Sequence, residues 1–273
     1  MKKLIDRGSS GEHGWSSLSR YLACPRKGRL TEEYVREEEM HYHYRGHLAH
    51  TGLAHLYARM MPRGRHTYLE PAEAVQAYAD KYPSPHRDRW LEPVLRMLPH
   101  YEAHWGGDAR RYEVLGVEEV VTLRVKHGLD RLPYTARYDL LVRERKTGKV
   151  YIWDHKVAYA LIPKVVESYE LSGQMLGLER YGRAKFKSKW GGIVLNFLRL
   201  DEKMQRDPEF ARPTVNISAL AVANFKHTIR YAHDVRDSFA DTDTKDVPGV
   251  YNEACWGKYG PCPFRWKCTR GGA

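Results

Sequence analysis

Apolar side chains in the first 105 residues recur at the spacing of a helix. The clearest set occupies positions i, i+3, i+4 and i+7 of one helix face: His50, Leu53, Ala54 and Tyr57. This set predicts a long helix over residues 33–61, with Gly46 and Gly52 as possible interruptions. Serines precede another apolar stretch that begins near residue 14, and Pro25 predicts the end of that helix or a new turn. Two more helices are predicted at 71–82 and 87–105.

Strand patterns replace the helical spacing after residue 112. Strands are predicted at 113–125, 134–142 and 149–157. The last two flank a polar turn, residues 143–148, that ends in Gly148 and predicts a hairpin. A helix at 164–181, a buried strand at 192–198 and a helix at 216–239 follow. This order predicts an α/β fold, with a central mixed sheet flanked by helices.

Composition narrows the class of protein. The chain has 273 residues, of which 42% are apolar and 29% charged, as in globular proteins and unlike disordered or collagen-like ones. No repeat or Gly/Ser linker is visible, so we predict one domain over 1–273. Its parts are a helical region (14–105), a core (112–200) and a C-terminal region (216–268). No uncharged apolar run approaches the ~20 residues that a membrane span needs. The basic residues 1–7 precede no apolar segment, which argues against a secretory signal.

The net charge of +11 favours a polyanionic partner, with nucleic acid the first candidate. Three stretches concentrate cations, one of them interleaved with aromatic residues: 26–29, 59–65 and 185–190. Such stretches can follow a phosphate backbone while rings stack on bases. Each stretch alone is equally typical of a solvated turn or helix end.

The predicted hairpin carries the strongest chemical signal. Residues two apart on a strand face the same side, so Asp154 and Lys156 project together, and Asp139 at the end of the neighbouring strand can lie across from them. Carboxylates are the ligands that Mg²⁺ prefers, and the metal lowers the pKa of a bound water beside a phosphate. The alternative is an Asp–Lys pair on a solvated face. The apolar residues around the pair argue against it, because unpaired charge near a core is costly.

These residues resemble the PD-(D/E)XK nuclease superfamily, and within it the RecB-like and AddB-like exonuclease branch. The resemblance extends from about Cys24 to Cys268. Four motifs carry it: G-x-x-x-H at Gly46–His50, the first acid at Asp139, (D/E)-x-K at Asp154–Lys156, and the downstream Gln at Gln174. The branch usually has a Tyr four residues after that Gln, where this chain has Leu178, and Tyr181 lies one turn later.

The resemblance implies a role for each residue and a dependence on Mg²⁺ or Mn²⁺. His50, Asp139, Asp154 and the backbone carbonyl of His155 would be metal ligands. Lys156 would be the catalytic lysine, and Gln174 would orient it or contact DNA. Five histidines lie between residues 41 and 55, so His50 could instead be a hydrogen-bonded core histidine, and Gln174 an ordinary polar helix residue.

One cysteine near the start and three near the end form a separate pattern: Cys24, Cys255, Cys262 and Cys268. The gaps of six and five residues differ from the C-x2-C spacing of common zinc knuckles and suit loops around a larger object. Four thiolates are the ligand set of a [4Fe–4S] cluster, and the AddB-like branch holds one in this order. Its first C-terminal gap is commonly two residues, so Cys255 is the poorest match. A Zn²⁺ site and unrelated free thiols remain as alternatives.

The resemblance implies a restriction-endonuclease-like fold in which an iron–sulfur cluster joins the two ends of the chain. Together these features predict a metal-dependent DNA nuclease, with an exonuclease of recombination, repair or phage DNA metabolism favoured. An endonuclease of the same fold and a non-catalytic iron–sulfur DNA-binding protein are the alternatives. No phosphate-loop motif G-x-x-x-x-G-K-[ST] is present, so DNA unwinding would need a partner helicase or recombination protein. We expect a cytoplasmic protein of a bacterial cell, with a phage origin compatible with its size.

Overall fold

The computed structural model describes residues 4–5, 10–34, 41–62, 68–158, 163–251, 253–257 and 260–269. The chain forms two compact units, each assembled from three stretches of sequence. Unit 1 comprises Met1–Ser9, Glu38–Val121 and Arg137–Ser218, and unit 2 comprises Ser10–Glu37, Thr122–Ala136 and Ala219–Ala273. The units describe how the chain packs, and the single domain over 1–273 stays a prediction.

Unit 1 is built around a mixed sheet. Its strands are β1 (Tyr112–His127), β2 (Asp130–Glu144), β3 (Val150–Ala158), β4 (Trp190–Arg199), β5 (Glu209–Ala211) and β6 (Thr214–Val215). The order is β1-β2-β3-β4-β5, and β6 also pairs with β4. Strands β2 and β3 are antiparallel, as the predicted hairpin requires, whereas β3 and β4 are parallel. The predicted α/β class with a central mixed sheet is confirmed.

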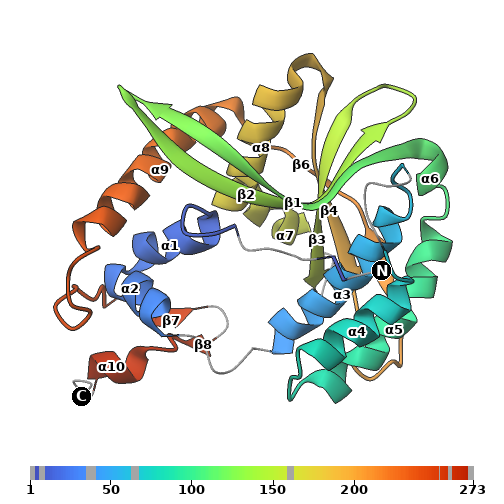
Figure 1. The fold of residues 1–273 in the computed structure, drawn as a ribbon, viewed down its shortest axis with the longest axis horizontal. Helices are drawn as coiled ribbons and strands as arrows, with labels where there is room; N and C mark the ends of the chain where they lie inside the picture. Colours follow the sequence, from blue (N-terminus) through green and yellow to red (C-terminus); the bar gives the residue numbers. More distant parts are fainter. Residues whose placement is uncertain are drawn as a thin grey trace. The chain divides into compact units, whose positions relative to one another are not determined.

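Helices of unit 1 pack on both faces of β3. They are α3 (His41–Ala58), α4 (Pro71–Lys81), α5 (Arg87–His104), α6 (Asp108–Arg111), α7 (Pro163–Glu170), α8 (Gly173–Phe186) and the short η1 (Lys187–Lys189). Helices α3, α4 and α5 lie side by side (Figure 1). The Trp153 ring contacts Tyr57 of α3, whereas the next residue, Asp154, bonds Gln174 of α8. Because neighbouring strand residues point to opposite faces, α3 and α8 cover opposite sides of β3.

Three expectations about these elements are wrong. The helix predicted at 33–61 does not include its first residues, because α2 ends at Glu33 and Tyr34 has extended backbone (φ −112°, ψ 118°). Residues 35–40, which belong to the predicted helix, lie outside the described residues. The same holds for residues 63–67, which include the end of the basic stretch 59–65. The helix predicted at 164–181 is two helices, α7 and α8, because Ser172 between them is extended. Asp139 lies inside β2 and not at its end.

Unit 2 is mainly helical. Besides residues 122–136 of β1 and β2, it contains α1 (Trp15–Ala23), α2 (Pro25–Glu33), α9 (Ala219–Ser238), η2 (Glu253–Cys255), β7 (Trp256–Gly257), β8 (Gly260–Pro261) and α10 (Arg265–Thr269). Pro25 occupies the first position of α2, where the missing N–H of proline costs nothing. Helix α1 packs against α2 and α9, and Phe225 of α9 contacts the Trp15 and Tyr134 rings.

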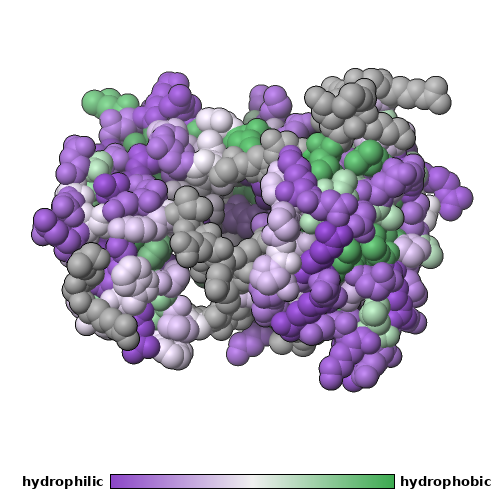
Figure 2. Space-filling model, turned by 60° about the horizontal axis from the view of Figure 1, so that its bottom comes forward, coloured by the Kyte–Doolittle hydropathy of each residue, from purple (hydrophilic) through white to green (hydrophobic). Residues whose placement is uncertain are grey.

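The visible surface in Figure 2 is mostly hydrophilic, with small separate hydrophobic areas. Among the described residues, no helix combines the length and the apolar character that a membrane crossing needs.

Candidate functional site

Asp154 and Lys156 meet on one face of β3, as the strand alternation predicts. Lys156 Nζ lies 2.5 Å from Asp154 Oδ2, and the Asp154 carboxylate is almost completely buried while Lys156 keeps 21% of its side chain exposed. A buried ion pair of this kind is costly to desolvate, so the arrangement is weak as a device for stability. The partial exposure of its side chain leaves Lys156 able to reach a ligand at the edge of the sheet.

Asp139 links the two residues predicted from separate motifs. Its Oδ1 lies 3.3 Å from His50 Nδ1 on α3, and its Oδ2 accepts a hydrogen bond of 2.6 Å from the backbone N–H of His155 on β3. The structure therefore brings His50, Asp139, Asp154 and Lys156 together within unit 1. The His155 ring lies 5.5 Å from the His50 ring, measured between centroids.

Glu118 of β1 belongs to the same cluster, although the sequence motifs do not include it. His50, Glu118 and Asp139 each offer a ligand atom, and these atoms all lie within 4.8 Å of one another. Glu118 Oε1 is 3.5 Å from His50 Nδ1, and Arg137 Nε is 3.2 Å from Glu118 Oε2. Oxygen and imidazole donors suit Mg²⁺ or Mn²⁺. The only sequence signal was an acidic pair, Glu118 and Glu119, inside a Val-rich strand.

The backbone of Glu118 explains why strand alternation misses it. Its φ of 51° lies in the left-handed region, which non-glycine residues adopt at a cost. Three consecutive residues, 116–118, are buried at this point, so the regular alternation of β1 is broken. The irregularity turns the Glu118 carboxylate into the buried cluster, whereas Glu119 is exposed.

Burial and neighbouring charges shift the ionisation of these groups. Burial raises the pKa of Asp154, although Lys156 opposes that shift. Burial alone would raise the pKa of Asp139 too, but His50, His155 and Lys156 hold it below its usual value. Burial would lower the pKa of Lys156, and the carboxylate of Asp154 holds it above its usual value instead. Lys156 is therefore charged at neutral pH.

Gln174 lies in the first turn of α8 and reaches the site. Its Nε2 donates a hydrogen bond of 2.9 Å to Asp154 Oδ1, so Gln174 contacts the carboxylate partner of Lys156. Tyr181, one turn further than the family pattern, packs against Phe186. The aromatic ring near Lys156 is Tyr169 of α7, whose centroid lies 5.4 Å from Lys156 Nζ. The sequence motifs did not single out Tyr169.

A network of buried polar side chains forms hydrogen bonds that reach the His155 ring. Asn196 of β4, directly opposite His155 in the sheet, contacts His155 Nδ1 at 2.9 Å. Arg212 donates to the side-chain oxygen of Asn196 at 3.1 Å. Because arginine cannot accept a hydrogen bond, the Asn196 oxygen must face Arg212 and its NH₂ group must donate to His155. Arg212 is in turn paired with Asp108 at 2.7 Å.

A family model described as the PD-(D/E)XK nuclease superfamily matches residues 15–269. The chain belongs to this superfamily. Its members use divalent metals, which agrees with the oxygen and imidazole donors at His50, Glu118 and Asp139. No curated protein matches the chain significantly.

Two crystal structures resemble this superfamily member. A protein from Eubacterium rectale named as a candidate exonuclease is 10% identical, with a TM-score of 0.52, over 92% of this chain and 91% of the other. The crystal structure of SSO0001 is 14% identical, with a TM-score of 0.40, over 94% of this chain and 86% of the other. At this identity, the E. rectale structure supports the fold alone.

The basic stretch at 185–190 exposes its cations but not the faces of its aromatic rings. Phe186 and Trp190 stack on each other with centroids 6.1 Å apart, and a Cβ on Gly182 of α8 would lie 2.4 Å from the Trp190 ring. The rings therefore pack against the helix and are only partly exposed. Lys185, Lys187 and Lys189 are exposed, so the stretch offers charge more than stacking surfaces.

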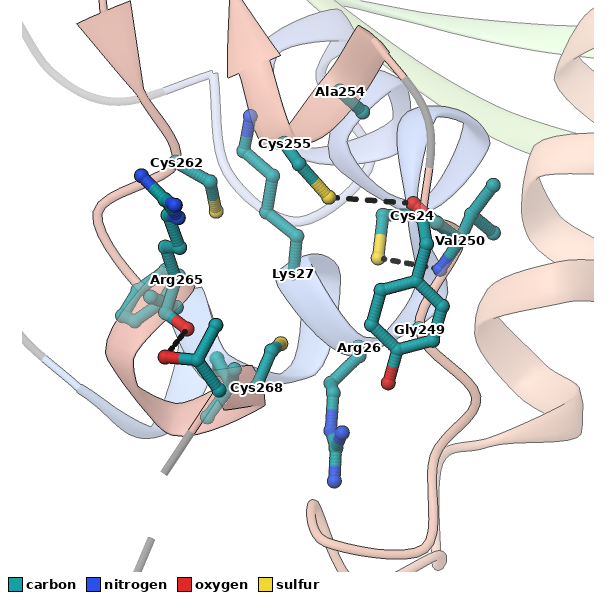
Figure 3. Close-up of a pocket in the computed structure, with 14 residues that line it drawn as sticks. Cys24, Arg26, Lys27, Gly249, Val250, Ala254, Cys255, Cys262, Arg265 and Cys268 are labelled. Carbon is teal, nitrogen blue, oxygen red and sulfur yellow. Dashed lines mark hydrogen bonds between the residues drawn. The ribbon is translucent and has the colours of Figure 1, made fainter. Parts of the chain in front are cut away.

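The four cysteines line one pocket of about 350 Å³ in unit 2. Figure 3 shows the four sulfur atoms turned toward a shared space, with none of them in a disulfide. The backbone N–H of Val250 donates to Cys24 Sγ at 3.4 Å, and Cys255 Sγ donates to the Val250 carbonyl at 3.6 Å. Burial raises the pKa of Cys262, and the thiols of Cys268 and Cys24 add to that shift. The sequence pattern thus correctly grouped residues from both ends of the chain.

Proposed function

We propose that this superfamily member is a metal-dependent DNA nuclease that hydrolyses phosphodiester bonds, and that it acts as an exonuclease. The convergence of His50 of α3 and Asp139 of β2 with Asp154 and Lys156 of β3 carries the proposal. A net charge of +11 suits a polyanionic substrate. Mg²⁺ or Mn²⁺, held by His50, Glu118 and Asp139 with Asp154 and the His155 carbonyl as further ligands, would lower the pKa of a water and neutralise developing charge.

The chain's own residues position the reacting groups. Lys156 holds a positive charge at the partly exposed edge of the site, where it can orient a water or stabilise charge on the phosphate. Gln174 binds Asp154 Oδ1, and Lys156 binds Asp154 Oδ2. The bond from Gln174 therefore fixes the carboxylate, and the carboxylate in turn orients the Lys156 ammonium. The hydrogen bond from His155 N–H fixes Asp139 in the same way.

The alternatives differ in what they require of this site. A non-catalytic DNA-binding protein has no need to bury Asp139 and Asp154 beside a lysine, because such charges are costly in a core. An endonuclease of the same fold uses the same groups, so the site does not separate it from an exonuclease. The motifs that resemble the RecB-like and AddB-like exonuclease branch favour the exonuclease. The proposal also includes a partner helicase or recombination protein that would unwind the DNA.

We further propose that the four cysteines hold a [4Fe–4S] cluster. A tetrahedral zinc site, with Zn–S bonds of about 2.3 Å, places its sulfurs about 3.8 Å apart. Of the described histidine, cysteine and acidic residues, His50, Glu118 and Asp139 bring three ligand atoms within 4.8 Å of one another. No three of the cysteine sulfurs lie as close together as that. A cluster is larger than one ion and spaces its thiolates further apart. The pocket volume and the hydrogen bond from the Val250 N–H to Cys24 Sγ fit this group.

The test of the nuclease is digestion of linear and circular DNA with Mg²⁺ or Mn²⁺. We expect release of nucleotides from linear DNA and none from closed circles. Asp154→Asn and Lys156→Ala should each lower the rate at least about 100-fold, because the first weakens a proposed metal ligand and the second removes a positive charge beside the reacting phosphate. Lys146→Ala, in the exposed hairpin turn, is the matched control and should cut normally. Wild-type cutting by either site variant would show that the site is assigned wrongly.

A further inference from the structure

Unit 2 exposes aromatic rings with cations beside them. Trp256, Trp266 and Tyr34 are 64%, 50% and 38% exposed. The Arg265 guanidinium carbon lies 5.5 Å from the Trp256 ring centroid, and Lys267 Nζ lies 4.9 Å from the Trp266 ring and 3.8 Å from the Tyr34 ring. These five residues, which we call the aromatic–cation row, form two ring–cation groups, Trp256 with Arg265 and Lys267 with Trp266 and Tyr34. The two groups are joined along the chain, because Arg265 and Trp266 are neighbours in α10.

The row is held in place by its surroundings. Trp256 follows Cys255 and pairs with Pro261 of β8, next to the hydrogen bond from Cys262 N–H to the Cys255 carbonyl. Lys267 Nζ donates to the Tyr34 hydroxyl at 2.5 Å, which ties α10 to the end of α2. Rings fixed in this way lose little conformational entropy when a ligand binds.

Exposure of two tryptophans in one short stretch needs an explanation. Tryptophan is highly buried on average, and exposed aromatic groups close together mark binding surfaces. The neighbouring cysteine pocket adds Arg26 and Lys27 to Arg265, and no carboxylate is among the residues that line it. This part of unit 2 is therefore both aromatic and positively charged, which favours an anionic ligand with flat apolar faces.

We propose that the aromatic–cation row is a binding surface for single-stranded DNA, on which the three rings stack against unpaired bases and Arg265 and Lys267 contact phosphates. Rings with cations beside them match a strand in which bases lie beside phosphates. Duplex DNA does not fit this chemistry, because its bases are already stacked on each other and hide their faces. The proposal rests on DNA being the substrate of the proposed nuclease, and it names the form in which DNA is bound.

Binding of fluorescein-labelled oligothymidylate to the full chain, carrying Asp154→Asn to prevent digestion, tests the proposal by fluorescence anisotropy. Oligothymidylate forms no hairpins, so its bases are free. We expect Trp256→Ala and Trp266→Ala each to weaken binding about 5- to 140-fold, since stacking on one ring contributes about 1–3 kcal/mol. Trp266→Phe keeps a ring and should bind within about 3-fold of the parent. A duplex of equal length should bind more weakly than the single strand, and its affinity should respond less to the alanine variants.

Tyr82→Ala is the matched control, because Tyr82 in unit 1 is 46% exposed and has Lys81 5.0 Å from its ring. It should bind oligothymidylate normally. Unchanged affinity in both tryptophan variants, or equal losses in Tyr82→Ala, would overturn the proposal, as would tighter binding of the duplex. Thermal unfolding identifies any variant that fails to fold, and the alanine variant of the other tryptophan then decides.

The same experiment separates this proposal from the nuclease assignment. Loss of oligothymidylate binding in the row variants, together with a wild-type chain that cuts no DNA, would remove the nuclease function and leave the binding surface. Normal cutting by the wild type, together with unchanged affinity in the row variants, would remove the binding surface and leave the nuclease function.

Discussion

Charged residues of the site offset each other inside unit 1, where Lys156 pairs with Asp154 and His50 lies against Asp139. These residues differ in how local geometry places them. Asp139, Asp154, Lys156 and Gln174 lie in short motifs whose spacing on a strand or helix places them together. Glu118 has no such spacing, because its left-handed backbone breaks the alternation of β1. Tyr169 reaches Lys156 only through a tertiary contact. Residues placed by local geometry were predictable, and those placed by an irregularity or by packing were not.

Glu118→Gln tests whether this carboxylate helps to hold the metal. The substitution keeps the shape and removes the charge, so we expect the Mn²⁺ concentration for half-maximal cleavage to rise at least about 10-fold. The control is Glu119→Gln, since Glu119 is the exposed neighbour whose Oε2 accepts a hydrogen bond from the Tyr138 hydroxyl. Metal titration of the cleavage rate measures both. Equal shifts in the two variants, or none, would contradict the role of Glu118.

His55 makes the stability of the chain depend on pH. The imidazole is fully buried, and the backbone N–H groups of Ile5 and Leu69 point at its Nε2 and Nδ1, at 3.0 and 2.9 Å. Burial lowers the pKa of His55 from 6.5 to about 4. Below pH 6.5 the unfolded chain binds a proton that the folded chain does not take until about pH 4, so acidification through this window favours unfolding.

At about 1.4 kcal/mol per pKa unit, His55 should contribute about 2–3 kcal/mol to the loss of unfolding free energy between pH 7.5 and 4.5. Urea unfolding of wild type and His55→Gln at both pH values measures this part as the difference between them. His104→Gln, at an exposed histidine, serves as control and should retain the wild-type pH dependence. The idea fails if His55→Gln loses as much stability on acidification as the wild type.

Elements with a long, regular pattern were predicted well, and those defined by a single break or a few residues were not. The β2–β3 hairpin and buried strand β4 follow from period-two and apolar runs. The division between α7 and α8 depends on one residue, Ser172, which a helical period does not detect. Strands β5 and β6 have three and two residues and form only because β4 offers them a partner. Periodicity needs more residues than these elements contain.

Two glycines in α3 predict opposite effects of the same substitution. A Cβ at Gly46 would meet nothing within 4 Å, so Gly46→Ala should stabilise by about 1 kcal/mol through helix propensity. A Cβ at Gly52 would lie 2.8 Å from Leu98 Cδ2 and 3.0 Å from Val75 Cγ2, both in buried side chains. Overpacking there should offset the gain and destabilise by about 1–3 kcal/mol. Urea midpoints measure both, and equal shifts would contradict the packing of α3 on α4 and α5.

At the scale of the whole molecule, the cysteine pocket and the metal site should behave as separate pools of metal. Protein prepared without oxygen and with iron should be brown and contain about four irons per chain. EDTA should strip the oxygen- and imidazole-bound ions and leave the colour. Cys24→Ala should lose the iron and lower the melting temperature, because Cys24, at the start of α2, is the one proposed ligand that comes from the N-terminal segment. Metal analysis that finds zinc in iron-supplied protein would overturn the cluster and leave the nuclease untouched.

Unit 2 can be completed only late in biosynthesis, because its three stretches of sequence lie far apart along the chain. Helices α1 and α2 leave the ribosome early, but α9 and the last three cysteines emerge only after all the segments of unit 1. At about 5–20 residues per second, the apolar faces of α1 and α2 wait on the order of tens of seconds for their partners. The proposed cluster could therefore be completed only after Cys268, its last proposed ligand, has been synthesised. A nascent chain that stalls before this point presents those faces to chaperones and proteases.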